Sequence, residues 1–178
     1  MAVTNWSFDP AHSEIGFKVR HMMFSKVSGT FDTWDGDFQF DPDNPTEANA
    51  HIEIDAASID TGNEERDGHL VSGDFLCVEE YPTIDFETTG VEKVGDGELR
   101  LDGELTICGI TKPVSLDTEF HGKATDPWGA QRVGFTATTE LDRKEFDITW
   151  NQTLDAGGVL VGDTIEVEIN VQATLDEE

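Results

Sequence analysis

The sequence predicts an all-β protein: a single antiparallel barrel of eight strands, spanning residues 1–178 as one domain, with one short helix at a barrel end. Three observations support this fold class. Apolar and polar residues alternate along most of the chain, as in strands that bury one face. Clusters of Gly, Asp, Asn and Pro separate these segments, and the connections are too short for parallel crossovers. The later segments are long and follow one another as hairpins, which favours an up-and-down barrel over a sandwich.

Each strand is justified by its own alternation. In the segment 14–21, Ile15, Phe17 and Val19 share one face, and Lys18 occupies the other. The sequence GDGE, at residues 95–98, is typical of a hairpin turn, and TDPWGA forms a longer turn between two later strands. The remaining alternating segments cover residues 36–40, 51–55, 83–88, 98–108, 113–120, 132–141 and 164–175.

One stretch, TGNEERDGHLVSGDF at residues 61–75, interrupts the alternation. Thr61 and Glu64 have the spacing of a capping box, with the threonine at the N-cap and the glutamate at N3. Gly73 fits the position that ends a helix. The sequence therefore predicts a helix over residues 62–72.

This helix would place Arg66, His69 and Leu70 on one face, because they are three and four positions apart. Leu70 and Phe75 would anchor it on the barrel. Two interpretations of the polar residues stay open. Arg66 forms a salt bridge with Asp67 or a loop carboxylate, and His69 is a hydrogen-bonded structural histidine. Alternatively, both meet the polar head of a ligand at the barrel mouth.

The net charge is −27, from 38 acidic and 11 basic side chains. Such a surface repels nucleic-acid phosphates and anionic lipid headgroups, so we expect no nucleic-acid partner and no stable membrane insertion. The acids are spread along the whole chain, as in proteins from a high-salt cytoplasm; a merely acidic soluble protein is the alternative. Unfolding at low salt that KCl reverses would distinguish the two.

The cysteines and the N-terminus indicate a cellular compartment. Cys77 and Cys108 are far apart and form no CxxC, so two free thiols in a reducing compartment are expected. The segment 1–13 has neither a basic n-region nor an apolar h-region, and no run approaches the ~18 apolar residues of a membrane helix. The sequence as given therefore predicts a cytoplasmic protein.

Motifs of catalysis are missing from the sequence. It has no P-loop, no GxGxxG strand–helix junction and no GxSxG. Its histidines have no metal-ligand spacing; they are His12, His21, His51, His69 and His121. The sequence therefore predicts neither an enzyme, nor a metal site, nor a cofactor. A barrel of about eight strands has an interior that is filled by side chains or holds one small ligand, and here it would be apolar.

Four segments together resemble the YceI-like family, the polyisoprenoid-binding proteins with a lipocalin-like barrel. They are WSFDPAHSEIGFKVRHMMFSKVSGTF, IDAASIDTGNEERDGHLVSGDFLCVEEYPTIDF, GELTICGITKPVSLDTEFHG and GFTATTELDRKEFDITWN. The resemblance covers the chain from Trp6 to Ala173. It departs from the family at Asp147, which stands where the family has glycine, so the backbone beside Arg143 can differ.

The resemblance implies a hydrophobic tunnel that binds an isoprenoid quinone, a polyprenyl phosphate or a similar lipid. It also implies a homodimer in many members and no established catalysis. The polar head of the ligand would meet His21, Arg66 and His69. The apolar tail would lie against Phe17, Val19, Phe31, Phe38, Ile52, Leu70, Phe75, Ile84, Phe86 and Phe135.

Two other functions stay open beside transport or storage of such a ligand. One is an enzyme that acts on an isoprenoid-type or redox substrate with His21 or His69 as general base, which requires the ring to lie in a cleft. The other is a structural or stress-response barrel that is fully packed. This last function predicts a barrel without a continuous cavity.

Overall fold

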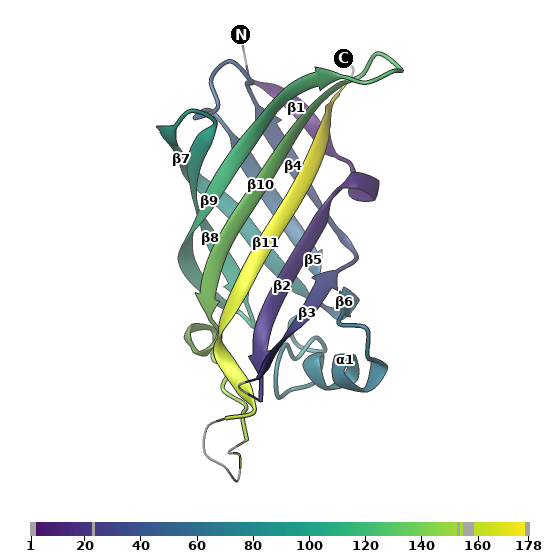
Figure 1. Ribbon diagram of the computed structural model, residues 1–178, viewed down its shortest axis with the longest axis vertical. Helices are drawn as coiled ribbons and strands as arrows, with labels where there is room; N and C mark the ends of the chain where they lie inside the picture. Colours follow the sequence, from purple (N-terminus) through teal and green to yellow (C-terminus); the bar gives the residue numbers. More distant parts are fainter. Residues whose placement is uncertain (1–2, 23, 153, 155–158, 177–178) are drawn as a thin grey trace.

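The computed structural model describes residues 3–22, 24–152, 154 and 159–176. In this part of the chain, eleven strands form one antiparallel sheet that closes on itself where β1 pairs with β11 (Figure 1). The predicted antiparallel barrel is thereby confirmed. The strands are β1 (Thr4–Phe8), β2 (Glu14–His21), β3 (Ser25–Phe31), β4 (Trp34–Phe40), β5 (Asn49–Asp55), β6 (Ile59–Asp60), β7 (Thr83–Gly95), β8 (Glu98–Ile107), β9 (Ile110–Thr125), β10 (Gln131–Asp142) and β11 (Val161–Leu175).

Eleven strands make an eight-stranded barrel because the first three barrel strands are each interrupted. Strands β1 and β2 both pair with β11 and together fill one strand position of the barrel. Strand β4 pairs with β1 and β3 pairs with β2, so β3 and β4 fill the next position. Strand β5 pairs with β4 and β6 pairs with β3, so β5 and β6 fill the third. The breaks after β1 and β5 are single 3-10 turns, η1 (Pro10–His12) and η2 (Ala56–Ser58). In each, the preceding aspartate accepts a hydrogen bond from the turn's backbone, as Asp9 does from the Ala11 N–H at 3.0 Å.

An aromatic cluster fills the upper end of the barrel, the end at the top of Figure 1 where both termini lie. Phe40 is fully buried there, and its ring lies 5.2 Å from the Phe135 ring and 5.3 Å from the Phe120 ring. The Trp6 indole N–H donates to the Phe40 carbonyl at 3.2 Å. The cluster comprises Trp6, Phe8, Phe38, Phe40, Ala48, Ala50, Phe120, Val133, Phe135, Ala173 and Leu175.

A second apolar cluster closes the lower end, where α1 lies in Figure 1. Its buried members are Phe75, Phe146 and Ile148, and Leu70 and Trp150 pack against them. These residues come from the segment after α1 and from the 3-10 turn η3 (Arg143–Phe146) with the chain that follows it. The lower end is therefore closed by loops and short helices, whereas strand residues fill the upper end.

The helix α1 spans Glu64–Leu70, inside the predicted range 62–72. Its N-cap is Asn63, whose side-chain oxygen accepts the Arg66 backbone N–H at 3.0 Å. Gly62 has a φ of 80°, which is outside the helical region. The helix therefore begins two residues later than predicted, and asparagine caps it as effectively as threonine would.

The predicted capping box of Thr61 and Glu64 is wrong. The Thr61 hydroxyl oxygen instead accepts the side-chain Nε–H of Arg66 at 2.7 Å. At the other end the helix stops at a cap on Val71, whose N–H is bonded to the carbonyls of the last turn, and not at Gly73. A capping motif read from spacing alone does not show which of two neighbouring polar residues turns its side chain toward the helix.

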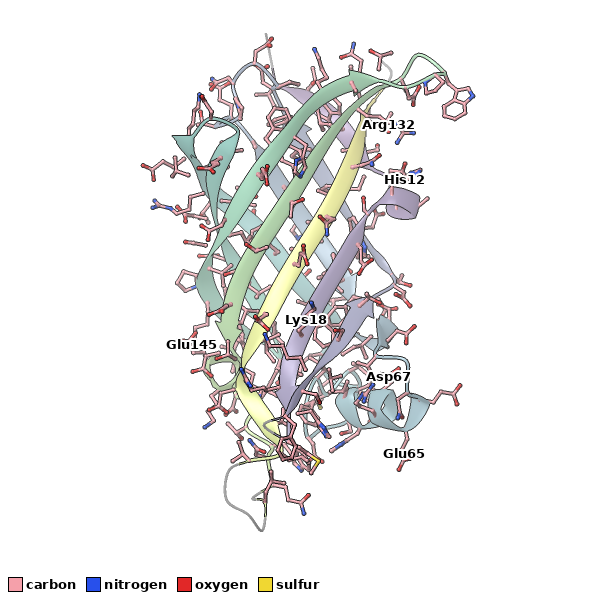
Figure 2. The ribbon with its side chains drawn as sticks, in the orientation of Figure 1. His12, Lys18, Glu65, Asp67, Arg132 and Glu145 are labelled. Atoms are coloured by element: carbon pink, nitrogen blue, oxygen red, sulfur yellow. The ribbon has the colours of Figure 1, made fainter. Side chains whose placement is uncertain are left out.

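A network of charges ties η1 to the turn between β9 and β10 at the upper end. Arg132 donates to the Asp9 carboxylate at 2.7 Å and to the Asp126 carboxylate at 2.8 Å. Figure 2 shows His12 and Arg132 close to this end of the barrel. Hydrogen bonds from His12 and then from Arg132 lower the pKa of Asp9, and the hydrogen bond from Arg132 lowers the pKa of Asp126.

Replacing Arg132 with glutamine is expected to lower the melting temperature modestly at pH 7 and hardly at all near pH 2. Folded-state pKa values below the unfolded value of about 3.9 mean that the stabilisation is present above that pH and is lost as the pH falls through the folded values. Thermal melts of both proteins from pH 2 to 8 would measure this. A difference in melting temperature between the two proteins that stays constant down to pH 2 would contradict this expectation.

Candidate functional site

The barrel encloses a cavity of about 290 Å³ between the two end clusters. Apart from Gly16, three threonines and Arg143, every residue that lines it is apolar. The threonines are Thr88, Thr118 and Thr139. No carboxylate of the described residues lines this cavity, although the chain has 38 acidic side chains. The chamber is therefore suited to an apolar molecule and unsuited to a metal ion or a sugar.

All ten apolar residues that the sequence predicts for the site line this chamber. They come from six strands and from the segment that follows β6. The alternation explains the result, because residues two positions apart point to the same side of a closed sheet. Their contact with a ligand stays a prediction. The ten residues are Phe17, Val19, Phe31, Phe38, Ile52, Leu70, Phe75, Ile84, Phe86 and Phe135.

The three polar residues predicted for the site lie outside the chamber lining. His21 is the last residue of β2. The Arg66 guanidinium is held by Thr61, donating to its hydroxyl and to its carbonyl, both at 2.7 Å. The structure thus joins Arg66 to a threonine where a salt bridge to Asp67 was one expectation.

His69 is held in a polar and aromatic cluster at the lower end. Its Nε2 lies 2.9 Å from a carboxylate oxygen of Asp74, and its ring packs edge-on against Phe75 and Trp150 at 5.0 and 4.6 Å. This arrangement matches the interpretation of a hydrogen-bonded structural histidine. Phe75 separates the imidazole from the chamber, because it contacts both.

The charged residue on the chamber lining is Arg143, for which the sequence predicted no role. It is 4% exposed and donates to the carbonyls of Gly162 at 2.9 Å and Ile148 at 2.8 Å. A third, longer contact of 3.4 Å reaches the carbonyl of Val161. The nearest carboxylate is Asp163, at 3.8 Å. Burial lowers the pKa of the Arg143 guanidinium, since its charge is removed from water.

The alternation of β10 contains the signal that would have found Arg143. Phe135, Ala137, Thr139 and Leu141 all line the chamber, and Arg143 is the next residue of that series. Extending a period of two by one residue, past the end of the predicted strand, places the arginine on the inward side.

Asp147, where the sequence departs from the family, adopts the left-handed conformation with φ 61° and ψ 24°. Glycine adopts this conformation without steric cost, and aspartate is one of the side chains that tolerate it. Asp147 caps η3 through its backbone N–H, which bonds the carbonyls of Arg143 and Lys144. The substitution therefore leaves Arg143 on a tight turn of a kind that glycine would also form.

Both cysteines are free thiols at the lower end. The Cys108 sulfur lies 3.4 Å from the carbonyl of Phe75, and its partial burial is the main cause of its raised pKa. Among residues 3–22, 24–152, 154 and 159–176, no helix has both the length and the apolar character needed to cross a bilayer.

The family of YceI-like domains matches residues 6–173 of the chain. A UPF0312 protein of Ectopseudomonas mendocina is 44% identical over 138 residues, which cover 78% of this chain and 72% of that protein. A UPF0312 protein of Vibrio parahaemolyticus is 42% identical over the same length, covering 78% and 73%.

Solved structures share the barrel. The Campylobacter jejuni YceI protein has a TM-score of 0.76 at 32% identity, over 95% of this chain and 96% of that one. Burkholderia cenocepacia BcnA has a TM-score of 0.82 at 21% identity, over 94% and 99%. A polyisoprenoid-binding domain from Saccharophagus degradans has a TM-score of 0.70 at 14% identity, over 98% and 100%. At such low identity, the last two likenesses show the fold alone.

Proposed function

The chain belongs to the family of YceI-like domains, and we propose that it binds a long apolar or amphiphilic molecule, of the isoprenoid quinone or polyprenyl type, inside its barrel for transport or storage. The carrying observation is the chamber itself, because its wall is apolar along the whole barrel. Burying apolar surface yields about 25 cal/mol per Å² before the costs of association, so a chain of several isoprene units would bind well. The similar domain from Saccharophagus degradans is described as a polyisoprenoid-binding domain, which supports this ligand class.

The two ends of the barrel suggest how the ligand is oriented. Phe40 lines the chamber at the upper end and is completely buried, so an apolar tail would end against it. At the lower end, Arg143 offers a charge, and the residues that close the barrel belong to loops and short helices. We therefore place the polar head of the ligand at the lower end of the barrel.

The chamber counts against a fully packed structural barrel, which predicts no continuous cavity. For the enzymatic alternative, His21 and His69 would both have to reach a substrate from outside the lining. Binding without catalysis therefore has the better support.

The proposal is tested by extracting the purified protein with organic solvent and analysing the extract by mass spectrometry. We expect a stoichiometric lipid with an isoprenoid chain when the protein is produced in its natural host or refolded with isoprenoid quinone. Extracts that never contain such a lipid, together with no binding of added quinone, would overturn the proposal.

Replacing Ala137 with phenylalanine is expected to weaken quinone binding by about tenfold or more, which corresponds to about 1.4 kcal/mol. Ala137 is 7% exposed and lines the middle of the chamber beside Phe86 and Leu116, so a phenyl ring there would occupy ligand space. Fluorescence titration with a quinone would measure the affinity.

The matched control is phenylalanine at Thr138, the next residue of β10, which faces outward. The control should bind quinone as the wild type does. If Ala137→Phe and Thr138→Phe bound quinone with equal affinity, the ligand would not use the chamber.

A further inference from the structure

The hairpin of β2 and β3 differs in charge from the rest of the molecule. From Ile15 to Phe31 the sequence has no Asp or Glu, although the chain carries 38 acidic residues. The same segment contains Lys18, Arg20 and Lys26, out of only 11 lysines and arginines in the chain. A molecule of net charge −27 therefore has one segment that is locally positive.

The three cations are exposed and lie on the outer face of the barrel. Figure 2 shows Lys18 on this face of β2. Arg20 and Lys26 are direct cross-strand partners, an arrangement of like charges that disfavours the strand pairing. Glu166 is one carboxylate shared by all three cations: Lys26 lies 2.7 Å from it, Lys18 is its cross-strand partner, and Arg20 also helps to lower its pKa. Folding alone does not explain why a chain so rich in acids keeps this pair.

The tip of the same hairpin is apolar and exposed. Phe24 is 87% exposed and Met22 is 40% exposed, at the lower end of the barrel (Figure 1). The cations begin within about 10 Å of this tip, because a strand advances about 3.3 Å per residue. An aromatic ring in front of several cations is the combination that binds the interface of an anionic bilayer.

We propose that the tip of the β2–β3 hairpin, Met22 and Phe24 with Arg20 and Lys26 behind it, docks on the surface of a membrane that contains anionic lipids. Of the described residues of the tip, Met22 and Phe24 are exposed apolar side chains. A stable protein interface needs about 800 Å² on each partner, far more than two side chains supply. A flat bilayer accepts such a tip without a matching groove.

The overall negative charge does not prevent this docking at moderate ionic strength. The Debye length is about 8 Å at 0.15 M salt, so the carboxylates far from the hairpin tip are largely screened from the bilayer. Glu65, Asp67 and Glu145 also lie at the lower end (Figure 2) and oppose docking, so the hairpin cations and the apolar tip must outweigh them. Docking in this orientation would turn the lower end of the chamber, closed by Leu70 and Phe75, toward the membrane. The docking residues lie on the outer surface of the barrel, so docking does not require a ligand in the chamber.

Vesicle co-sedimentation of the full chain at 0.15 M NaCl tests the proposal. Wild-type protein should bind vesicles of phosphatidylglycerol and phosphatidylcholine and should not bind pure phosphatidylcholine. Phe24→Ser, and separately Arg20→Gln with Lys26→Gln, should each reduce the bound fraction at least about fivefold. These side chains are exposed, so the variants should melt as the wild type does.

Two control variants make the test specific. Trp128→Ser removes an aromatic side chain that is 85% exposed in the β9–β10 turn at the opposite end, and Lys93→Gln with Arg100→Gln removes two exposed cations elsewhere. Both should bind vesicles like the wild type. The proposal is overturned if wild-type protein does not prefer anionic vesicles, or if the controls lose as much binding as the hairpin variants. Binding to soluble polyglutamate without binding to vesicles would point to an acidic protein partner and would also overturn it.

Discussion

Replacing Phe40 with alanine is expected to lower the free energy of unfolding by about 3–5 kcal/mol, one of the two largest effects that we expect of any single substitution. The phenyl ring is completely buried at the upper end of the barrel. Its removal forfeits the burial of the ring and leaves a void that the surrounding strands cannot close, since they are held in register by the closed sheet.

The packing around Phe40 explains why the loss would be large. Its ring stacks on Phe38 at 5.4 Å and meets Phe120 and Phe135 edge-on at 5.3 and 5.2 Å. Such aromatic pairs contribute about 0.5–1.5 kcal/mol each beyond the area that they bury. The Phe40 carbonyl, which accepts from Trp6, is backbone and would stay in place.

Urea denaturation followed by tryptophan fluorescence would measure the change. Trp128→Ala is the control, because that side chain is 85% exposed and its loss should alter stability by less than about 0.5 kcal/mol. A Phe40→Ala loss below 1.5 kcal/mol would mean that the upper cluster rearranges and that the barrel end is not the fixed stop proposed for the ligand tail.

The fold could be predicted because its main determinant, alternation with a period of two, is local in the sequence. Ile15, Phe17 and Val19 on β2 show it without ambiguity. The interruptions of the first barrel strands were missed, although Asp9 before Pro10 has the residue types of a helix start. One turn of 3-10 helix is too short to disturb a pattern that resumes on its far side.

The site was predictable where it depends on the face of a strand and not where it depends on a rotamer. The apolar lining follows from the alternation alone, as Phe86 and Phe135 illustrate. The direction of a long polar side chain does not: Arg66 turns back to Thr61, and His69 turns to Asp74. Both are set by partners that the chain brings together only when folded. Arg143 was missed because a charged residue is expected outside, although the alternation of β10, extended by one residue into η3, places it inward, where it is buried.

Replacing Arg143 with methionine is expected to destabilise the protein by about 3 kcal/mol. The carbonyls of Gly162, at the start of β11, and of Ile148, just after η3, would lose the donor at 2.9 and 2.8 Å. The Val161 carbonyl would keep the hydrogen bond from the Asn151 side-chain amide at 2.7 Å. Methionine fills much of the volume with an apolar chain, so the loss reports on the hydrogen bonds more than on packing. Arg143→Lys keeps the charge without the forked geometry of the guanidinium, so its stability should lie between those of the wild type and Arg143→Met.

Chemical denaturation would give the stabilities, and amide exchange would show whether protection falls first at Ile148 and Val161.

The force that opposes the hydrogen bonds of Arg143 is desolvation, which lowers the pKa of the guanidinium and is only weakly offset by Asp163 at 3.8 Å. Buried charges replaced by apolar side chains sometimes stabilise a protein. If Arg143→Met were as stable as the wild type, desolvation would cancel the hydrogen bonds. A buried cation retained without benefit to folding would then be best explained by the polar head of a ligand, and quinone affinity of the same variant should fall. Loss of stability with unchanged quinone affinity would instead assign Arg143 to the closure of the lower end alone.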